Sequence, residues 1–332
     1  MHRIIASLLA LPCAPALCVP AAAQQAPASS SASASPASAK PAPAKPLPAK
    51  ALSAPKLVAL TLGIGVQHDS NVSIDDADLN IRKGDDGLLL SAGITLTPLA
   101  TRRTTLRLGY SYDEIRNREL TDFDLAIHGA SASVTRRFGR LTAGLDYQYS
   151  HVLLDGERYL AMHMASPSMS AFATPHLFVR GAVTFLRKDF ATVAPLRADT
   201  TMVGLDAYRF FARRKGYVAL SARVDDERTD GPEFAYKAWQ ASLRGQVPFR
   251  LLGASLRARL GYTFQRRDYS DITPSIGEKR RETRSTLTAA LDVPLSRTLT
   301  LRPAVRYVDR HSNVAVYDYR QTVVSTMLVW KP

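Results

Sequence analysis

The chain has few cysteines and, after its N-terminal segment, no long apolar run. Its 332 residues include two cysteines and two tryptophans, and both cysteines, Cys13 and Cys18, lie close to the N-terminus. Without that segment the chain has no disulfide, no thiolate metal site and no cysteine nucleophile. After the same segment no run of about 18 apolar residues occurs, which argues against a chain that crosses a membrane as helices.

The first 23 residues have the features of a secretory signal peptide. His2 and Arg3 form a basic start, residues 4–19 are mainly apolar, and small residues end the segment at Ala23. The residues that precede each cysteine fit a lipoprotein signal poorly. We therefore expect cleavage after residue 23 and a mature chain without cysteine.

Residues 24–55 consist almost wholly of Ala, Pro, Ser, Lys and Gln. A segment of this composition buries too little apolar surface to fold, so it predicts a disordered, extended linker. Its role is that of a spacer, or of a lysine-bearing contact with peptidoglycan or a partner. The folded domain is then expected over residues 56–332.

The chain has a net charge of +14 at pH 7. Such an excess often indicates a nucleic-acid partner. Here the basic residues are spread along the chain, and export also argues against nucleic acid. Lipopolysaccharide and other outer-membrane lipids, an anionic substrate, or a polar lumen wall are the better explanations.

From Leu57 onward the hydrophobic pattern has a period of two. Leu60, Leu62 and Ile64, for example, alternate with Thr61 and Gly63. Segments of this kind have one face for lipid and one for a polar interior, and they are long enough to cross a bilayer as tilted strands. The pattern predicts an all-β, transmembrane antiparallel barrel of about fourteen strands in a Gram-negative outer membrane. The expected strands are 57–69, 86–98, 103–115, 124–138, 141–154, 158–173, 176–189, 199–212, 216–228, 235–248, 253–268, 281–294, 298–310 and 317–330.

Short connections alternate with longer polar ones along these segments. Short turns, such as 139–140, belong to the periplasmic side of outer-membrane barrels, and long loops, such as 70–86, to the outside. This alternation predicts that both termini lie in the periplasm. A large soluble β-sandwich is the alternative, but long, evenly spaced strands with arginine on the inner face would be unusual there.

Tyrosines cluster near the expected strand ends and predict an aromatic girdle at the membrane interface. Strand propensity alone is the other explanation. The chain ends on Trp330, Lys331 and Pro332, which resembles imperfectly the aromatic end that the barrel assembly machinery reads. The tyrosines are Tyr110, Tyr112, Tyr147, Tyr149, Tyr262, Tyr269, Tyr307, Tyr317 and Tyr319.

A set of arginines falls on the polar parity of the expected strands. A charge on the lipid face costs about 2–4 kcal/mol at mid-membrane, so we expect these side chains to line the lumen. Acids of the same parity, Asp113, Asp146, Asp206, Asp225 and Asp292, are expected to pair with them. The set forms either a salt-bridge lattice that holds the barrel or a conduit for anionic solutes. Its members are Arg107, Arg180, Arg223, Arg244, Arg257, Arg259, Arg302 and Arg306.

The first expected strand is glycine-rich and ends in Asp69-Ser70-Asn71-Val72. Together with the closing segment, His311-Ser312-Asn313 through Arg320, it resembles the C-terminal barrel of the surface lipoprotein assembly modifier family. The resemblance covers about Leu57 to Trp330. It implies a fourteen-stranded barrel that assists transport or surface display of a lipoprotein client. The tetratricopeptide repeats that often precede this barrel have no counterpart here.

The same segment permits an enzymatic interpretation. His68 and Ser70 lie two residues apart, so they share a strand face, and their pattern resembles that of outer-membrane phospholipase A and lipid A deacylases. Against this, no glycine follows Asn71 and no third, orienting residue is identified. We expect no enzyme, and keep lipid hydrolysis at Ser70 with His68 as base as an alternative.

No cofactor or metal is expected. The histidines His128, His151, His163 and His176 stand far apart without ligand spacing. No glycine-rich phosphate loop opens a helix, since Gly63 and Gly65 lie in an expected strand.

Overall fold

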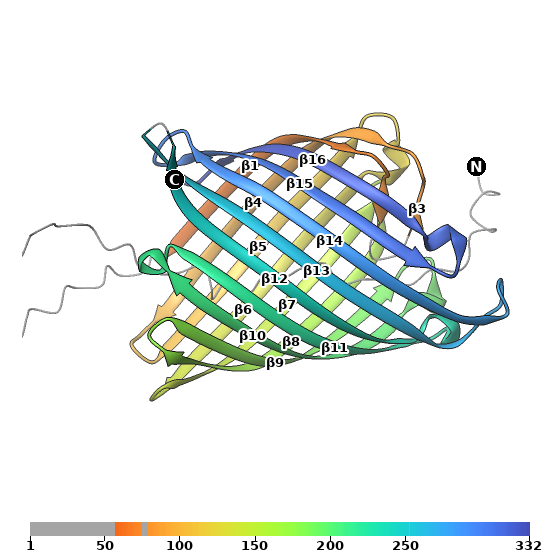
Figure 1. Cartoon of the computed structure of the whole chain (residues 1–332), viewed down its shortest axis with the longest axis horizontal. Helices are drawn as coiled ribbons and strands as arrows, with labels where there is room; N and C mark the ends of the chain where they lie inside the picture. The colour runs from red at the N-terminus through yellow and green to blue at the C-terminus, as the bar shows by residue number, and fades with distance from the viewer. Residues whose placement is uncertain (1–56, 75–78, 252) are drawn as a thin grey trace, which may run out of the picture.

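The computed structural model describes residues 57–74, 79–251 and 253–332, and most of them form one closed antiparallel β-barrel (Figure 1). Fourteen long strands pair in sequence order, and the first pairs with the last to close the sheet. The predicted fold is therefore confirmed, whereas the predicted signal peptide (1–23) and linker (24–55) lie outside the described residues. The barrel strands are β1 (Val58–Asp69), β4 (Asp85–Ala100), β5 (Thr104–Asn117), β6 (Leu125–Phe138), β7 (Leu141–Leu154), β8 (Glu157–Thr174), β9 (Leu177–Phe190), β10 (Ala198–Phe211), β11 (Gly216–Thr229), β12 (Tyr236–Leu251), β13 (Ala254–Thr273), β14 (Glu278–Pro294), β15 (Leu299–Ser312) and β16 (Tyr319–Trp330).

Most strand limits agree with the prediction within a few residues, and the largest difference is at the β13–β14 hairpin. There β13 runs to Thr273 instead of 268, and β14 starts at Glu278 instead of 281. The ladder shifts register between Asp268 and Ile272, and the added residues are largely polar. Because this part of the hairpin lacks apolar alternation, the pattern of period two does not detect it.

The two ends of the barrel differ, and we call them the turn end and the loop end. The turn end carries the short connections 101–103, 139–140, 175–176 and 295–298, and β1 begins and β16 ends there. The loop end carries longer connections, and 70–84 contains a small hairpin that the sequence did not predict, β2 (Ser73–Ile74) with β3 (Leu79–Asn80). The 3-10 turns at the loop end are η4 (Thr121–Phe123), η5 (Ala194–Leu196), η7 (Pro232–Phe234) and η8 (Ala315–Tyr317), while η6 (Ala212–Arg214) lies at the turn end.

One loop-end connection is as tight as any turn. β7 and β8 are joined by Asp155 and Gly156 alone, and both have positive φ, 50° and 74°. Two consecutive left-handed residues form the hairpin turn whose twist matches that of the flanking strands. The alternation of long and short connections is therefore interrupted at this hairpin.

The barrel is apolar outside and polar inside. On β11 the outward Val218, Leu220 and Val224 are 46%, 61% and 56% exposed, while Ser221 and Arg223 between them face the lumen. The same alternation runs along the other strands and leaves a broad apolar belt around the closed sheet. A continuous belt of this kind is stable only against acyl chains, so the chain is an outer-membrane-type β-barrel. A single closed sheet also excludes the alternative of a two-sheet sandwich.

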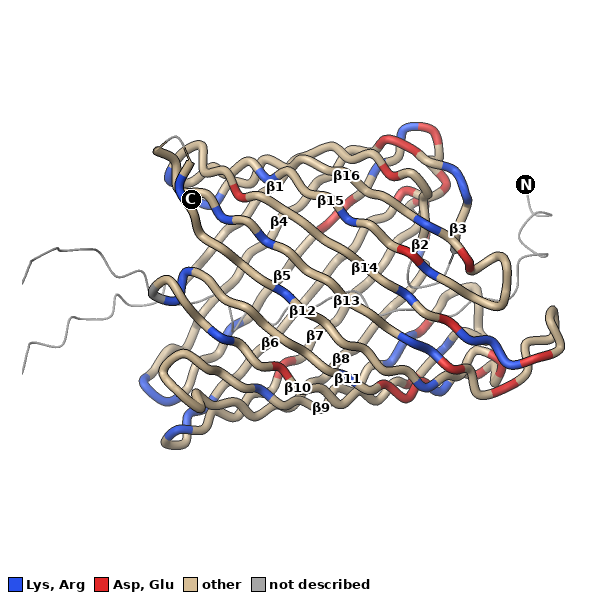
Figure 2. Tube along the Cα trace, in the orientation of Figure 1, with Lys and Arg blue, Asp and Glu red and all other residues tan. Residues whose placement is uncertain are grey.

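Charge is distributed unevenly along the barrel axis. Figure 2 shows acidic residues gathered mainly toward the loop end, on the right of the view, whereas basic residues occur at both ends. The turn-end connections among the described residues contain Arg102, Arg103, Arg140, Lys215 and Arg297 but no Asp or Glu. No helix in the described part of the chain is long and apolar enough to cross a membrane.

Candidate functional site

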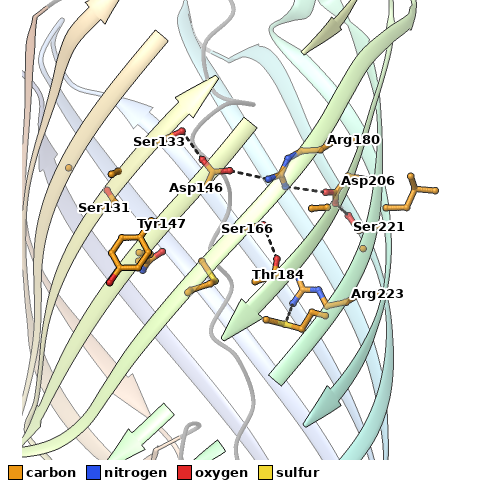
Figure 3. A pocket seen from close by; sticks show the side chains of 18 of the residues that line it. Ser131, Ser133, Asp146, Tyr147, Ser166, Arg180, Thr184, Asp206, Ser221 and Arg223 are labelled. Atoms are coloured by element: carbon orange, nitrogen blue, oxygen red, sulfur yellow. Dashed lines mark hydrogen bonds and ion pairs between the residues drawn. The ribbon is translucent and has the colours of Figure 1, made fainter. Parts of the chain in front are cut away.

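An alternating row of carboxylates and arginines crosses the lumen wall (Figure 3). Arg180 Nη2 on β9 lies 3.1 Å from Asp146 Oδ2 on β7, and Arg180 Nη1 lies 3.9 Å from Asp206 Oδ2 on β10. The row ends at Arg244 on β12, whose Nη2 lies 3.5 Å from Asp206 Oδ1. Because each strand contributes inward residues at every second position, neighbouring strands place these side chains at one height.

Serine hydroxyls complete the same row. Ser133 donates to Asp146 over 2.6 Å, and Ser221 donates to Asp206 over 2.6 Å. Arg244 in turn donates to Ser221 Oγ at 2.9 Å. The carboxylates of the row are thus held by both cations and hydroxyls. The row links six strands, which are β6, β7, β9, β10, β11 and β12.

Beside this row the lumen contains a polar cavity of about 310 Å³. Arg223 projects into it from β11 (Figure 3), and its only hydrogen bond among the described residues goes to Met202 Sδ at 3.9 Å. No carboxylate of the described residues lies within ion-pair distance of this guanidinium. Ser166 and Thr184, hydrogen-bonded to each other at 2.8 Å, also line the cavity. Asp225, two residues along the same strand, interacts with Arg223 electrostatically but without direct contact. A guanidinium without a contacting carboxylate is suited to a negatively charged ligand.

A second cluster lies on the wall formed by β13, β14 and β15. Asp292 is 1% exposed and contacts Arg257, Arg259 and Arg302, with Arg302 Nε at 2.7 Å from Oδ1 and Arg257 Nε at 3.7 Å from Oδ2. Arg259 also hydrogen-bonds this carboxylate. Three guanidinium groups around one carboxylate leave a positive surplus on this wall.

All eight arginines singled out in the sequence lie on the inward face of the strand ladder. Arg107 on β5 and Arg306 on β15 share the parity of the others, opposite the outward Leu108 and Val305. Of the five acids expected to pair with them, Asp146, Asp206 and Asp292 do so. Asp113 and Asp225 make no ion pair with an arginine among the described residues, and neither oxygen of the buried Asp225 has a hydrogen-bond partner.

Sequence reasoning missed a buried cluster at the loop end of the lumen. Glu227 accepts hydrogen bonds from Lys188 (2.6 Å), Thr200 (2.8 Å) and Tyr236 (3.1 Å), and the Lys188 and Glu227 side chains are 0% and 1% exposed. An apolar group packs on the same wall, with Phe190 1% exposed. The sequence signal that could have indicated this cluster is that Lys188 and Glu227 both fall on the inward positions of their strands.

A related group of arginines and tyrosines lies across β13, β14 and β15. Glu282 binds Arg280 and Arg310, and the Arg280 guanidinium stacks on the ring of Tyr317 at 3.3 Å. Tyr317 belongs to η8 and is fully buried, so the last loop folds inward here. With Tyr269 and Tyr319, which are also buried, this contradicts the prediction of a girdle for three of the nine tyrosines. The outward face of the barrel carries the rest: Tyr110, Tyr112, Tyr147, Tyr149, Tyr262 and Tyr307.

The motif Asp69-Ser70-Asn71-Val72 closes the barrel at the loop end. Gln321 of β16 donates to both carboxylate oxygens of Asp69, at 3.0 and 2.8 Å. Asn71 donates to the Arg320 carbonyl at 3.2 Å and accepts the Arg82 amide at 2.9 Å. The side chains thus extend the β1–β16 ladder beyond its last backbone pair, and Val72 is buried behind them.

The segment Ser312-Asn313-Val314 repeats this arrangement on β15. Asn313 donates to the Lys279 carbonyl at 3.1 Å and accepts the Arg281 amide at 2.8 Å. Val314, like Val72, is 6% exposed. The two segments that carry the family resemblance therefore have the same structural role, in which an asparagine amide replaces a missing rung between neighbouring strands.

His68 and Ser70 both lie on the lipid face, as their parity predicts. His68 Nδ1 is 2.8 Å from Asp86 Oδ1 on β4, so the structure provides the orienting residue that the sequence did not identify. No hydrogen bond among the described residues joins His68 to Ser70. The Ser70 hydroxyl instead accepts the amide of Thr322 at 2.8 Å, and its own amide donates to the Thr322 carbonyl. Ser70 is therefore a rung of the β1–β16 seam.

The four histidines considered as metal ligands are scattered over the barrel. His128 Nδ1 lies 2.8 Å from the Tyr110 hydroxyl, and His163 Nδ1 lies 2.9 Å from that of Tyr147. The described residues contain no group of three or more His, Cys, Asp or Glu placed to hold a metal.

Comparison with known proteins gives fold likeness alone. No protein-family model and no curated protein sequence matches the chain. Among solved structures, an anion-selective porin from Comamonas acidovorans is 10% identical with a TM-score of 0.48, over 83% of this chain and 98% of that one. OmpT of Vibrio cholerae is 8% identical with a TM-score of 0.48, over 83% and 97%. A bacterial polysaccharide outer membrane secretin is 10% identical with a TM-score of 0.44, over 82% and 98%.

Proposed function

We propose that this barrel is a transport path across the outer membrane for solutes or segments that carry anionic groups. The observation that supports it is the surplus of arginine over carboxylate on the lumen wall. Asp292 faces three arginines, and Arg223 has no carboxylate within ion-pair distance among the described residues. A cationic lumen raises the local concentration of anions and lowers that of cations.

Planar-bilayer recording across a KCl gradient tests this path. The purified barrel is expected to conduct with a reversal potential that reports a preference for chloride. Replacing Arg223 and Arg302 together by Gln should move that potential toward zero, since it removes two lumen charges. Arg228→Gln with Arg116→Gln, the same charge change on the outer face, should leave it unchanged. Cation preference or absence of conductance contradicts the proposed path.

Assistance to a surface lipoprotein is the second candidate, and the repeated Ser-Asn-Val arrangement favours it. Both segments that resemble the assembly modifier family fix loop-end connections in the same way. We propose that a lipoprotein client, encoded near this chain, reaches the surface with its help. Surface exposure of that lipoprotein should fall on deletion of the barrel, and unchanged exposure contradicts this role.

We also infer that Ser70 is not a catalytic nucleophile, although Asp86 orients His68. The support is the pair of hydrogen bonds to the Thr322 backbone, one accepted by the Ser70 hydroxyl and one donated by the Ser70 amide. The purified barrel in mixed micelles should release no fatty acid above a detergent blank. Release that disappears in both Ser70→Ala and His68→Ala proteins, but not in Ser73→Ala, contradicts this inference.

For location, we propose that the turn end, where β1 begins and β16 ends, faces the periplasm, and that both chain termini lie on that side. Short connections at one end and long ones at the other support this orientation. The C-terminal strand, with Trp330 outward at the turn end, is then the segment that the barrel assembly machinery meets. Outer-membrane lipid surrounds the belt, and lipopolysaccharide surrounds the loop end.

A further inference from the structure

On the outer face at the loop end, strands β11 to β14 carry a concentrated group of charges. The register places Asp226 opposite Lys237, Lys237 opposite Asp268, and Asp268 opposite Arg281, so these side chains form one row across four strands. All of them have the outward parity, and Lys237, Asp268 and Arg281 are exposed. The row therefore faces the surroundings of the barrel and not its lumen.

Both carboxylates of this row have a basic partner on their own strand. Asp268 receives hydrogen bonds from Arg266 at 3.0 to 3.3 Å, and Asp226 lies 3.4 Å from Arg228. Among the described residues, neither Lys237 Nζ nor the Arg281 guanidinium has a carboxylate within ion-pair distance. The row thus has two cations that its own acids do not neutralise.

The backbone of Arg281 is held firmly while its side chain stays outside. Its amide donates to Asn313 Oδ1 at 2.8 Å, and its carbonyl accepts the Asn313 amide at 3.4 Å. Asn313 belongs to the Ser-Asn-Val segment that fixes the last loop. The position of this cation is therefore set by the fold, although its guanidinium is exposed.

Several other outer-face cations at the loop end are paired within the protein. Arg116 lies 2.6 Å from Glu114, Arg158 lies 2.8 Å from Asp189, and Arg320 lies 3.3 Å from Asp309. Neutralised pairs of this kind attract an external anion weakly. The contrast sets the row at Lys237 and Arg281 apart from these pairs.

Aromatic side chains lie directly below this row. Trp239 of β12 and Phe264 of β13 are in contact, with ring centroids 5.2 Å apart, and Trp239 is 45% exposed. Trp239 is two residues from Lys237 along the strand, a rise of about 7 Å. Because tryptophan prefers the boundary between acyl chains and head groups, the cations above it lie at head-group depth.

We propose that Lys237 and Arg281 bind a phosphate group of lipid A across Asp268, whose charge Arg266 neutralises. The acyl chains of the same lipid then lie along Trp239 and the apolar belt. Two cations in excess match a phosphate, and the aromatic contact below matches the acyl part of the same molecule. This site rests on the proposed orientation, which places the loop end in the outer leaflet, and is independent of conduction through the lumen.

Native mass spectrometry of the detergent-purified barrel tests the site. Bis-phosphorylated lipid A is titrated against the wild-type chain and against the Lys237→Gln/Arg281→Gln double variant. The apparent Kd of the variant is expected to be roughly tenfold or more weaker, from the loss of two charge-assisted contacts. The matched control, Arg116→Gln/Arg158→Gln, has the same change of net charge and should bind as the wild type.

Two further measurements separate the phosphate from the rest of the lipid. Dephosphorylated lipid A should bind the wild-type chain as weakly as intact lipid A binds the double variant. Inorganic phosphate alone should give no adduct that survives at comparable concentration. The proposal is overturned if the wild type and the double variant bind lipid A equally. It is also overturned if the wild type binds intact and dephosphorylated lipid A equally, or binds free phosphate with the affinity of the lipid. Both residues are exposed, and unchanged heat-modifiability of the variant in electrophoresis checks that it folds.

Discussion

At the scale of single residues, the charges at the loop end of the lumen are unusual because water hardly reaches them. Lys188 and Glu227 are 0% and 1% exposed, and Thr200 and Tyr236 also bind the same carboxylate. A buried ion is costly unless it is paired and hydrogen-bonded. Here a carboxylate has three donors, which offsets the loss of its hydration.

Replacing Glu227 by Gln should therefore destabilise the barrel strongly. It keeps the shape of the side chain but removes the anion that faces Lys188, and loss of one member of a buried pair costs about 3–5 kcal/mol. Urea unfolding in lipid vesicles, followed by tryptophan fluorescence, measures the change in free energy of unfolding.

The matched control is the adjacent Asp226→Asn, on the outer face of the same strand. Its carboxylate is 43% exposed beside Arg228, and exposed pairs contribute about 0–1 kcal/mol. Equal destabilisation by the two substitutions would show that burial of Glu227 is not what makes it matter.

At the scale of elements, the seam between β1 and β16 depends on side chains as well as backbone. Asn71 joins the Arg320 carbonyl to the Arg82 amide, and it is 5% exposed. Asn71→Ala removes both hydrogen bonds, which takes the side-chain partner from the Arg320 carbonyl and leaves the Arg82 amide with Asn80 Oδ1 alone. We expect a loss of about 1–3 kcal/mol in unfolding free energy and faster amide exchange over 79–84.

Hydrogen exchange with mass spectrometry checks the Asn71 prediction. Asn80→Ala serves as the control within the same connection, since among the described residues its carboxamide accepts the same Arg82 amide, at 3.1 Å, but does not reach β16. If amides 79–84 are equally protected in Asn71→Ala and in the control, Asn71 does not replace a rung of the ladder.

The apolar belt gives a second prediction at this scale. Leu220 lies mid-strand on the outer face of β11 and is 61% exposed. Leu220→Arg is expected to cost about 2–4 kcal/mol of unfolding free energy in vesicles, because the charge must enter the acyl region. Leu295→Arg, in a turn, should change it by less than about 1 kcal/mol. Similar costs at both positions would argue against lipid at Leu220.

The alternation of apolar and polar residues predicts some features of these elements and not others. The alternation at Leu60, Leu62 and Ile64 determines which face of a strand meets lipid, and so it locates strands and the inward arginines. It says nothing of depth or partner. Tyr317 was expected in a girdle, yet it turns inward because η8 folds over Arg280. The contact of His68 with Asp86 depends on the β1–β4 register across a long connection, which no local pattern encodes.

At the scale of the whole molecule, the difference between the ends predicts how the barrel is inserted. The described residues contain no cysteine, so single cysteines engineered into the barrel can be labelled without one of its own reacting. Ser275→Cys, in the β13–β14 loop, should react with an impermeant maleimide on intact cells. Arg140→Cys, in a β6–β7 turn, should react only after the outer membrane is permeabilised.

Reversed labelling would contradict the orientation and, with it, the lipid A site, but not conduction through the lumen. Labelling of both positions on intact cells would indicate leaky cells. Loss of periplasmic marker proteins into the medium detects that case.

The turn-end connections carry basic residues but no acids, so this mouth of the barrel attracts anions in addition to the lumen wall. The two attractions should respond differently to ionic strength. The exposed basic residues of these turns act through water, where the Debye length falls from about 10 Å at 0.1 M salt to about 3 Å at 1 M. The three arginines around Asp292 surround a carboxylate that is 1% exposed, and mobile ions shield them less. Chloride preference that survives in molar salt would therefore come from the lumen wall, and the part that vanishes would come from the basic mouth.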